Sequence, residues 1–263
     1  MVNCKKHKLF TNIDFNWGFI LTKSWLNIVS DNQRNKLGVA WFVIEPVLFA
    51  FVYFIVFNYI VVLQVKNGFL FILLGLSLWL WFAKCVSRSN LSIVSAKNIL
   101  NTVKIEPINY VTIAFVQGTF LSLPLIFLII IYSSLHNGLS LAALCQLVLL
   151  LISFGLVIFS CCIIFSLLGV FFSDFTNILP SALTALMFVS GVFFELNQEQ
   201  KLHSMLLLNP IASAIQSYRG IGLHASITIQ NTVYVAVWAL TFTPIALMIY
   251  YSARKSILEK INE

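Results

Sequence analysis

Long apolar segments separated by short polar connections constrain this sequence more than any other feature. A membrane-spanning helix needs about 20 consecutive, mostly apolar residues, because the hydrocarbon core of a bilayer is about 30 Å thick. Hydrophobic residues make up 60% of the chain and charged residues 10%, whereas soluble domains average about 25% charged residues. The sequence therefore excludes a soluble globular domain and predicts an all-α integral membrane protein.

Six apolar segments are predicted to cross the membrane. Short polar turns at 66–68 and 136–138 reverse the chain, and Pro46 and Pro124 lie inside the first and third segments. The spans and their connections use almost all of the chain, so we expect a single transmembrane domain over residues 1–263 and no separate soluble catalytic domain. The predicted spans are residues 37–63, 69–86, 108–135, 141–172, 178–194 and 231–251.

The distribution of basic residues predicts which side of the membrane each connection faces. Lys and Arg concentrate in the cytoplasmic loops of membrane proteins. In the six-span arrangement, 13 basic residues lie before the first span, between the second and third spans, or after the last span, and three lie on the opposite side. Both termini are therefore predicted to be cytoplasmic. These basic residues are not interleaved with aromatic residues on one soluble face, so we expect no nucleic-acid partner.

Residues 1–36 are expected to form a cytoplasmic N-terminus that contains an interface helix. This helix, over residues 17–28, is too polar to span a bilayer, and tryptophan is favoured at the membrane surface. The residues expected to share one side of it are Trp17, Leu21, Trp25 and Ile28. We expect the helix to lie in the plane of the membrane surface.

The polar stretch 84–109 predicts a short amphipathic helix between the second and third spans. Asn90 belongs to the pair of residues that offers a helix cap, and Lys97 falls on the polar face. The apolar residues that recur at helical spacing on the opposite face are Ile93, Ala96, Leu100 and Val103. Such a helix either rests against lipid headgroups or docks into a soluble partner, and both alternatives are open at this point.

Glu45 lies one to two turns inside the first predicted span, one turn after Trp41. A carboxylate at that depth is costly unless it faces protein or water. We therefore expect Glu45 to mark a functional surface near a cytoplasmic entrance, together with Trp41. The alternative is that the side chain of Glu45 extends to the membrane interface.

The stretch 195–230 predicts two short helices, over residues 201–208 and 212–219, neither of which is long enough to cross the bilayer. Pro210 disfavours a continuous helix through the residue before it. A broken helical pair re-enters a membrane only where its backbone groups face protein or a wet cavity. The alternative is an external loop that covers the bundle.

We expect this stretch to close the outer mouth of a channel. Apolar side chains would seal the constriction, and Arg219 would lie near the mouth. The candidate gate residues are Met205, Leu206, Leu207, Asn209, Pro210, Ile211 and Arg219.

Several motifs follow one another in a recognisable order. They are Leu37-Gly38-Val39-Ala40-Trp41 with Glu45-Pro46, Gly75 with Trp79 and Phe82, residues 90–107, Leu208-Asn209-Pro210 and Tyr218-Arg219. In order and spacing they resemble the membrane permease subunits of ABC-2 type exporters, in particular those that export O-antigen, capsule and related polysaccharides. The resemblance covers nearly the whole chain. It departs from the family pattern at Asp174, where the loop lacks the basic residue often found nearby.

The resemblance implies a homodimer of six-span subunits in the cell inner membrane, assembled with two copies of an ABC ATP-binding subunit. It implies that a lipid-linked glycan is exported, that residues 90–103 form the coupling helix in contact with the ATPase, and that residues 195–222 supply the outer gate helices. No Gly-x-x-x-x-Gly-Lys-Ser/Thr motif occurs in the chain. ATP and Mg are therefore expected in the partner subunit, and no catalytic residue, metal or cofactor is expected in this chain.

Three other functions remain open at this point. An ABC-2 permease for a drug or a small lipid would share the fold. A membrane-embedded acyltransferase or glycosyltransferase would need converging acids, histidines or a metal site, whereas the four histidines are scattered in loops. A passive channel or scaffold would need no ATPase partner.

Overall fold

The structure is a computed structural model that describes residues 15–33, 36–57, 68–103, 105–194, 209–224 and 229–262. Within these ranges all the regular elements are helices, which agrees with the all-α prediction. The elements are α1 (Trp17–Gln33), a 3-10 turn η1 (Gly38–Ala40), α2 (Trp41–Ile55), α3 (Gly68–Asn90), α4 (Ser92–Ser95), α5 (Lys97–Thr102), α6 (Ile108–Asn137), α7 (Leu141–Phe171), α8 (Phe175–Val189), α10 (Pro210–His224) and α11 (Ile229–Asn262).

Four of the described helices, α3, α6, α7 and α11, are long and apolar enough to cross a membrane. They contain 23, 30, 31 and 34 residues. The helices α2 and α8 are apolar but have only 15 residues each, which corresponds to about 22 Å. The chain is thus a multi-pass membrane protein with four helices of spanning length, and the six-span arrangement stays a prediction. Residues 58–63 of the first predicted span lie outside the described residues.

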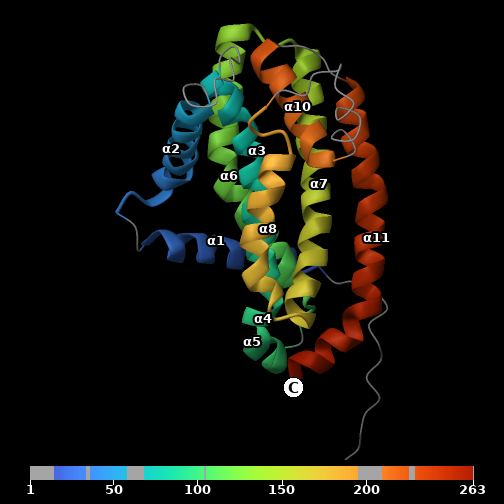
Figure 1. Ribbon diagram of the computed structural model, residues 1–263. Helices are drawn as coiled ribbons and strands as arrows, with labels where there is room; N and C mark the ends of the chain where they lie inside the picture. Colours follow the sequence, from blue (N-terminus) through green and yellow to red (C-terminus); the bar gives the residue numbers. More distant parts are fainter. Residues whose placement is uncertain are drawn as a thin grey trace, which may run out of the picture.

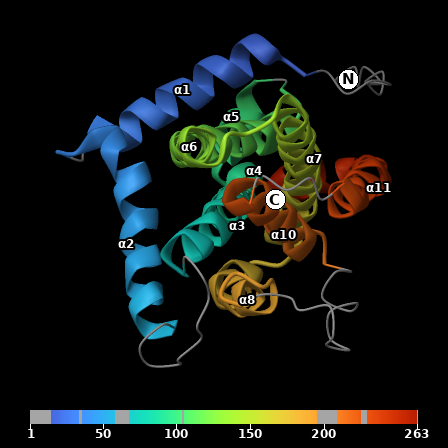
Figure 2. The same cartoon turned by 90° about the horizontal axis from the view of Figure 1, so that it is seen from above.

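The helix α3 lies at the centre of the bundle, with α2 and α11 on opposite sides (Figure 2). In the apolar windows of the two helices, 72% of the α3 residues but only 22% of the α11 residues are buried inside the protein. A hydrophobic helix that is buried all round belongs in the interior, whereas one with a free apolar side faces lipid. The α3 helix is therefore the packing axis, and the rest of the chain leaves most of the apolar surface of α11 uncovered.

Glycines let α3 approach its two long neighbours closely. A Cβ atom on Gly118 of α6 would lie 2.9 Å from the Cα atom of Cys85. A Cβ atom on Gly169 of α7 would collide with the backbone oxygen of Asn90. Small residues at such crossings allow close helix packing, which drives helix association in membranes.

The helix predicted over residues 17–28 is present as α1 and continues to Gln33, and its place at the membrane interface stays a prediction. It runs across the long helices and packs on α6 (Figure 1). Trp17, Leu21 and Trp25 are exposed on one side, in agreement with the predicted stripe. Ile28 is wrongly included in that stripe, because it lies one turn after Ser24 on the buried side.

The ends of the last two predicted spans differ from the structure. The α8 helix ends at Val189, five residues early, because Gly191 adopts a left-handed φ of 70° and the following turn folds inward, burying Val192 and Phe193. The α11 helix instead continues through the predicted C-terminal tail. Near its end, Nζ of Lys260 donates to the carbonyl of Phe171, 3.1 Å away, at the C-terminus of α7.

Candidate functional site

The central polar stretch begins differently from the prediction, because α3 continues four residues beyond its predicted end. Asn90 is the last residue of α3 and not the cap of a new helix. The N-cap of α4 is Leu91, which makes no side-chain capping bond. The side-chain amide Nδ2 of Asn90 donates to the hydroxyl of Thr176 in α8, 3.1 Å away. The backbone of Asn90 lies against Gly169 of α7. Asn90 therefore joins the ends of α3, α7 and α8.

The single helix predicted over residues 90–103 is also corrected, because the structure has two short helices. They are separated at Ala96, whose φ of −89° and ψ of 0° lie outside the helical range. The break lets α4 pack against α3, α6 and α7 while α5 continues toward α11. The end of α11 lies beside α5 at this end of the bundle (Figure 1).

The predicted apolar stripe is therefore divided between two sides. Ile93 and Ala96 are buried against the bundle, and Leu100 is half-buried. Only Val103 of the stripe is exposed, and Lys97 is partly exposed. We call the exposed apolar residues of this segment the α4–α5 face; they are Leu91, Val94, Ile99 and Val103. Sequence periodicity missed three of the four because it selected the apolar stripe, most of which packs against the bundle.

Two ion pairs hold the N-terminal part of the chain to α3. Nζ of Lys84 lies 3.2 Å from Oε2 of Glu45 in α2, and Nη1 of Arg88 lies 3.3 Å from Oδ2 of Asp31 in α1. Lys84 and Arg88 are four residues apart, which places both cations on one side of α3. Their spacing is a sequence signal that the prediction of Glu45 did not use.

Glu45 thus has a protein partner, as its depth in the predicted span requires. Its side chain is 45% exposed and that of Lys84 is 20% exposed, so the pair is accessible from one side. Trp41 begins α2 one turn earlier and is exposed. Trp41 and Glu45 are thus accessible neighbours on α2, and their place at a channel entrance stays a prediction.

A third ion pair anchors α11 to the start of α6. The guanidinium of Arg254 contacts Oε1 of Glu106, and both side chains are nearly buried. One turn earlier, the hydroxyl of Tyr250 accepts a hydrogen bond from the backbone nitrogen of Ile108, 3.1 Å away. In the sequence, Arg254 is one of the basic residues that follow the last predicted span. The charge count could not locate its partner, which is 148 residues away.

At the other end of the bundle, the break predicted at Asn209 and Pro210 is the start of α10. Oδ1 of Asn209 accepts from the nitrogen of Ile211, 3.0 Å away, and its amide donates to the hydroxyl of Ser190, 3.2 Å away. Proline suits the first helical position because its missing N–H is not needed there. Ile211 is buried. The candidate gate residues Met205, Leu206 and Leu207 lie outside the described residues.

Arg219 lies inside the bundle, among backbone carbonyls. Its Nε donates to the carbonyl of Phe71, 3.0 Å away, and its Nη1 donates to that of Gly191, 2.8 Å away. Its Nη2 donates to the carbonyl of Val192, and the guanidinium stacks on the Phe71 ring, 3.5 Å from the ring centre. A Cβ atom on Gly75 would collide with this guanidinium, so a larger residue there would have to displace it from its present position.

Arg219 is buried within the single chain, and its place near an outer mouth stays a prediction. Only 7% of the residue is exposed, because the α10 helix that carries it packs against α3 and α7. The carbonyls of Gly191 and Val192 follow the C-terminus of α8, where the helix dipole favours a cation. Arg219 therefore fastens the turn after α8 to both α3 and α10.

A second polar cluster fixes α10 from the opposite side. Nε2 of Gln146 in α7 donates to the hydroxyl of Thr232 in α11, 2.8 Å away. The hydroxyls of Thr232 and Ser217 are also 2.8 Å apart. Hydrogen bonds of this kind hold helices together inside membranes. Together with Arg219, they anchor α10 to three of the four long helices through α3, α7 and α11.

No group of three or more His, Cys, Asp or Glu side chains is placed to hold a metal ion within the part of the chain that the structure describes.

Comparisons with known proteins match this chain over most of its length. No protein-family model matches it. Two relatives are O-antigen export system permease proteins RfbA from Klebsiella pneumoniae. One is 28% identical over 223 residues (82% of this chain and 83% of the relative), and the other is 26% identical over 221 residues (82% and 85%). A protein of the same name from Myxococcus xanthus is 26% identical over 192 residues (70% and 72%). The resemblance to polysaccharide-export permeases is thus confirmed, since the chain is similar to O-antigen export system permease proteins over most of its length.

Proposed function

We propose that this chain is the membrane permease subunit of an ATP-driven ABC exporter that moves a lipid-linked polysaccharide of the O-antigen or capsule type across the inner membrane. The observation that carries the proposal is the similarity to O-antigen export permeases over 82% of the chain. The four helices of spanning length agree with it. The chain is not itself an enzyme in this proposal, and ATP hydrolysis with Mg takes place in a separate subunit.

The α4–α5 face is the contact that we assign to the ATPase. It lies at the end of the bundle to which α3, α7 and α11 all contribute. Its four exposed apolar residues belong to a segment that also presents Asn98 and Asn101 to solvent. An apolar patch surrounded by polar residues is typical of a protein interaction site. Because α3 leads directly into α4, a displacement of this face by the ATPase would be transmitted to α3 at the centre of the bundle.

A homodimer with two ATPase subunits supplies the channel in this proposal. The chain offers exposed apolar side chains on the two short helices, where a second copy or lipid can cover them. They are Leu48, Phe49, Phe51 and Val52 on α2 and Ile178, Phe188 and Val189 on α8. The region 195–230 is the outer gate, with Arg219 and Asn209 holding its α10 part in place. The positive-inside distribution supports cytoplasmic termini.

Deletion of the gene followed by complementation tests the proposal. Loss of surface polysaccharide with accumulation of the lipid-linked glycan inside the cell is the expected result, and the wild-type chain should restore the surface polymer. An inactive Walker-motif variant of the co-purifying ATPase is the control for the ATP requirement. Unchanged surface polysaccharide, with altered sensitivity to drugs, would instead favour the small-molecule permease.

A further inference from the structure

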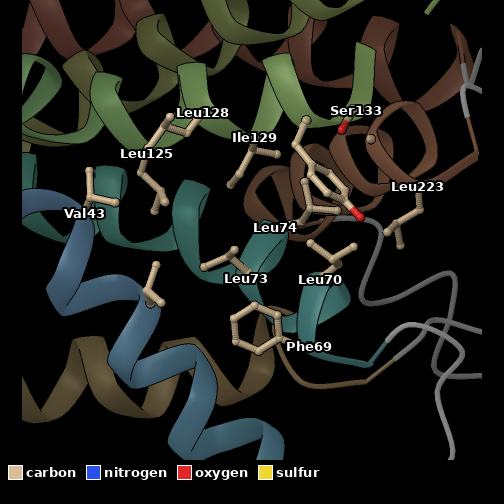
Figure 3. Close-up of a pocket in the computed structure, with 13 residues that line it drawn as sticks. Val43, Phe69, Leu70, Leu73, Leu74, Leu125, Leu128, Ile129, Ser133 and Leu223 are labelled. Atoms are coloured by element: carbon tan, nitrogen blue, oxygen red, sulfur yellow. The ribbon is translucent and has the colours of Figure 1, made fainter. Parts of the chain in front are cut away.

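A pocket of about 290 Å³ lies between α2, α3, α6 and α10. Figure 3 shows Val43 at one end of it and Ser133 with Leu223 at the other. The floor is formed by deeply buried side chains, among them Leu73, Leu74 and Ile129. Among the 13 lining residues that the structure describes, only Tyr132 and Ser133 carry polar side chains. The pocket is thus an apolar space with hydroxyls at one end only.

The pocket has an exposed edge on the α6 side. Leu128 and Tyr132 line it and are 51% and 40% exposed, so they form its rim on the outer side of α6. Both α3 and α6 are helices of spanning length. The surroundings of such a rim are therefore the hydrocarbon chains of the bilayer.

The size and direction of the pocket suit a single hydrocarbon chain. A dry cavity of about 150 Å³ lined by Leu, Ile and Phe takes up benzene, and this pocket is about twice that volume. Its α6 residues extend from Leu125 to Ser133, about 12 Å along the helix axis. A spanning helix runs roughly along the bilayer normal, which is also the average direction of the lipid chains.

We propose that this pocket binds one acyl chain of a bilayer phospholipid, which enters past Leu128 and Tyr132 and lies between α2 and the rest of the bundle. The two hydroxyls at one end mark the side on which the polar part of the lipid lies. The α2 helix packs mainly on α3 and α6, so a chain in this pocket fills the space behind it. The bound lipid is thus a structural component, distinct from any exported molecule.

Photolabelling of the full-length protein tests the proposal. The protein is reconstituted into nanodiscs that contain phosphatidylethanolamine with a diazirine in the middle of one acyl chain, and labelled residues are mapped after illumination. We expect enriched labelling of α3 and α6 at the pocket, and one lipid per chain retained through detergent purification by native mass spectrometry. Leu73→Phe and, independently, Ile129→Phe should reduce pocket labelling at least fivefold, because the ring occupies the space.

Leu240→Phe is the matched control, since it makes the same change on a residue of α11 that is 73% exposed. It should leave pocket labelling and the retained lipid unchanged. Equal labelling of the pocket in both filled variants would overturn the proposal. So would pocket labelling no stronger than that at Leu240, or crosslinks from the pocket to a second copy of the chain. A change in surface polysaccharide is not a readout here, so failure of the proposed export function would be seen separately.

Discussion

Arg219 shows how a single residue can connect three elements of this protein. A guanidinium has five N–H donors in a planar fork, and leaving a buried carbonyl without a donor costs about 1–3 kcal/mol. Arg219 supplies donors to the carbonyls of Phe71, Gly191 and Val192. Because Gly75 has no side chain, it leaves the space that the guanidinium occupies. The arginine and the glycine therefore act as a pair, although they are far apart in the sequence.

Arg219→Lys should lower the free energy of unfolding by about 1–3 kcal/mol for each carbonyl that loses its donor, because a single ammonium cannot reproduce the planar fork. Gly75→Ala should have a similar effect by displacing the guanidinium. The measurement is the apparent melting temperature of purified protein in detergent. Arg88→Lys is the control, since its ion pair with Asp31 is exposed and worth about 0–1 kcal/mol. Equal melting temperatures for all four proteins would contradict this role of Arg219.

We predict that breaking the ion pair between Glu45 and Lys84 affects activity and not stability. Their ion pair is partly exposed, so its loss should change the free energy of unfolding by at most about 1 kcal/mol. We expect Glu45→Gln to reduce surface polysaccharide several-fold at normal expression. The double exchange Glu45→Lys with Lys84→Glu should restore it, because the pair is re-formed with opposite polarity. Full activity of Glu45→Gln would show that the carboxylate has no functional role.

Among the elements, α4 and α5 depart furthest from the sequence prediction. A stripe at helical spacing indicates which residues share a side of an unbroken helix. It does not indicate where the helix breaks. In the structure the helix breaks at Ala96, Ile93 is a core residue and Ile99 is exposed.

Cysteine crosslinking to a co-purified ATPase separates the two sides of this segment. Val94→Cys and Ile99→Cys should form crosslinks, because both positions are exposed on the α4–α5 face. Ile93→Cys is the internal control and should remain unreacted, since that position is fully buried within the chain. The buried native Cys85 should stay unreacted as well. Crosslinks from Ile93→Cys as strong as those from Val94→Cys would show that the α4–α5 face is not the side that contacts the ATPase.

At the scale of the whole molecule, labelling can test which side of the membrane each end of the bundle faces. The turn at Gly138 and the end of α11 lie at opposite ends of the long helices (Figure 1). In a background without native cysteines, Gly138→Cys should react with a membrane-impermeant maleimide in intact cells. Ser256→Cys, exposed near the C-terminus, should react only after permeabilisation. The reverse pattern would invert the topology that the basic residues predict.

The sequence by itself determined the properties that depend on local composition and periodicity. Apolar length predicts α6 and α7 to within two residues at each end, because a helix that crosses lipid must satisfy its backbone hydrogen bonds internally. Polar content and tryptophan predict the interface helix α1 for a similar reason. The order of short motifs pointed to the permease relatives that the comparisons confirmed.

Only the tertiary structure decided which side chains meet across the bundle. Glu45 with Lys84, Glu106 with Arg254, and Arg219 with its three carbonyls all connect residues from different helices. Their pairing depends on how the helices cross, which in turn depends on contacts such as Gly118 against Cys85. Hydropathy contains no information on those crossings, because an apolar side chain that faces lipid and one that faces a neighbouring helix are equally apolar.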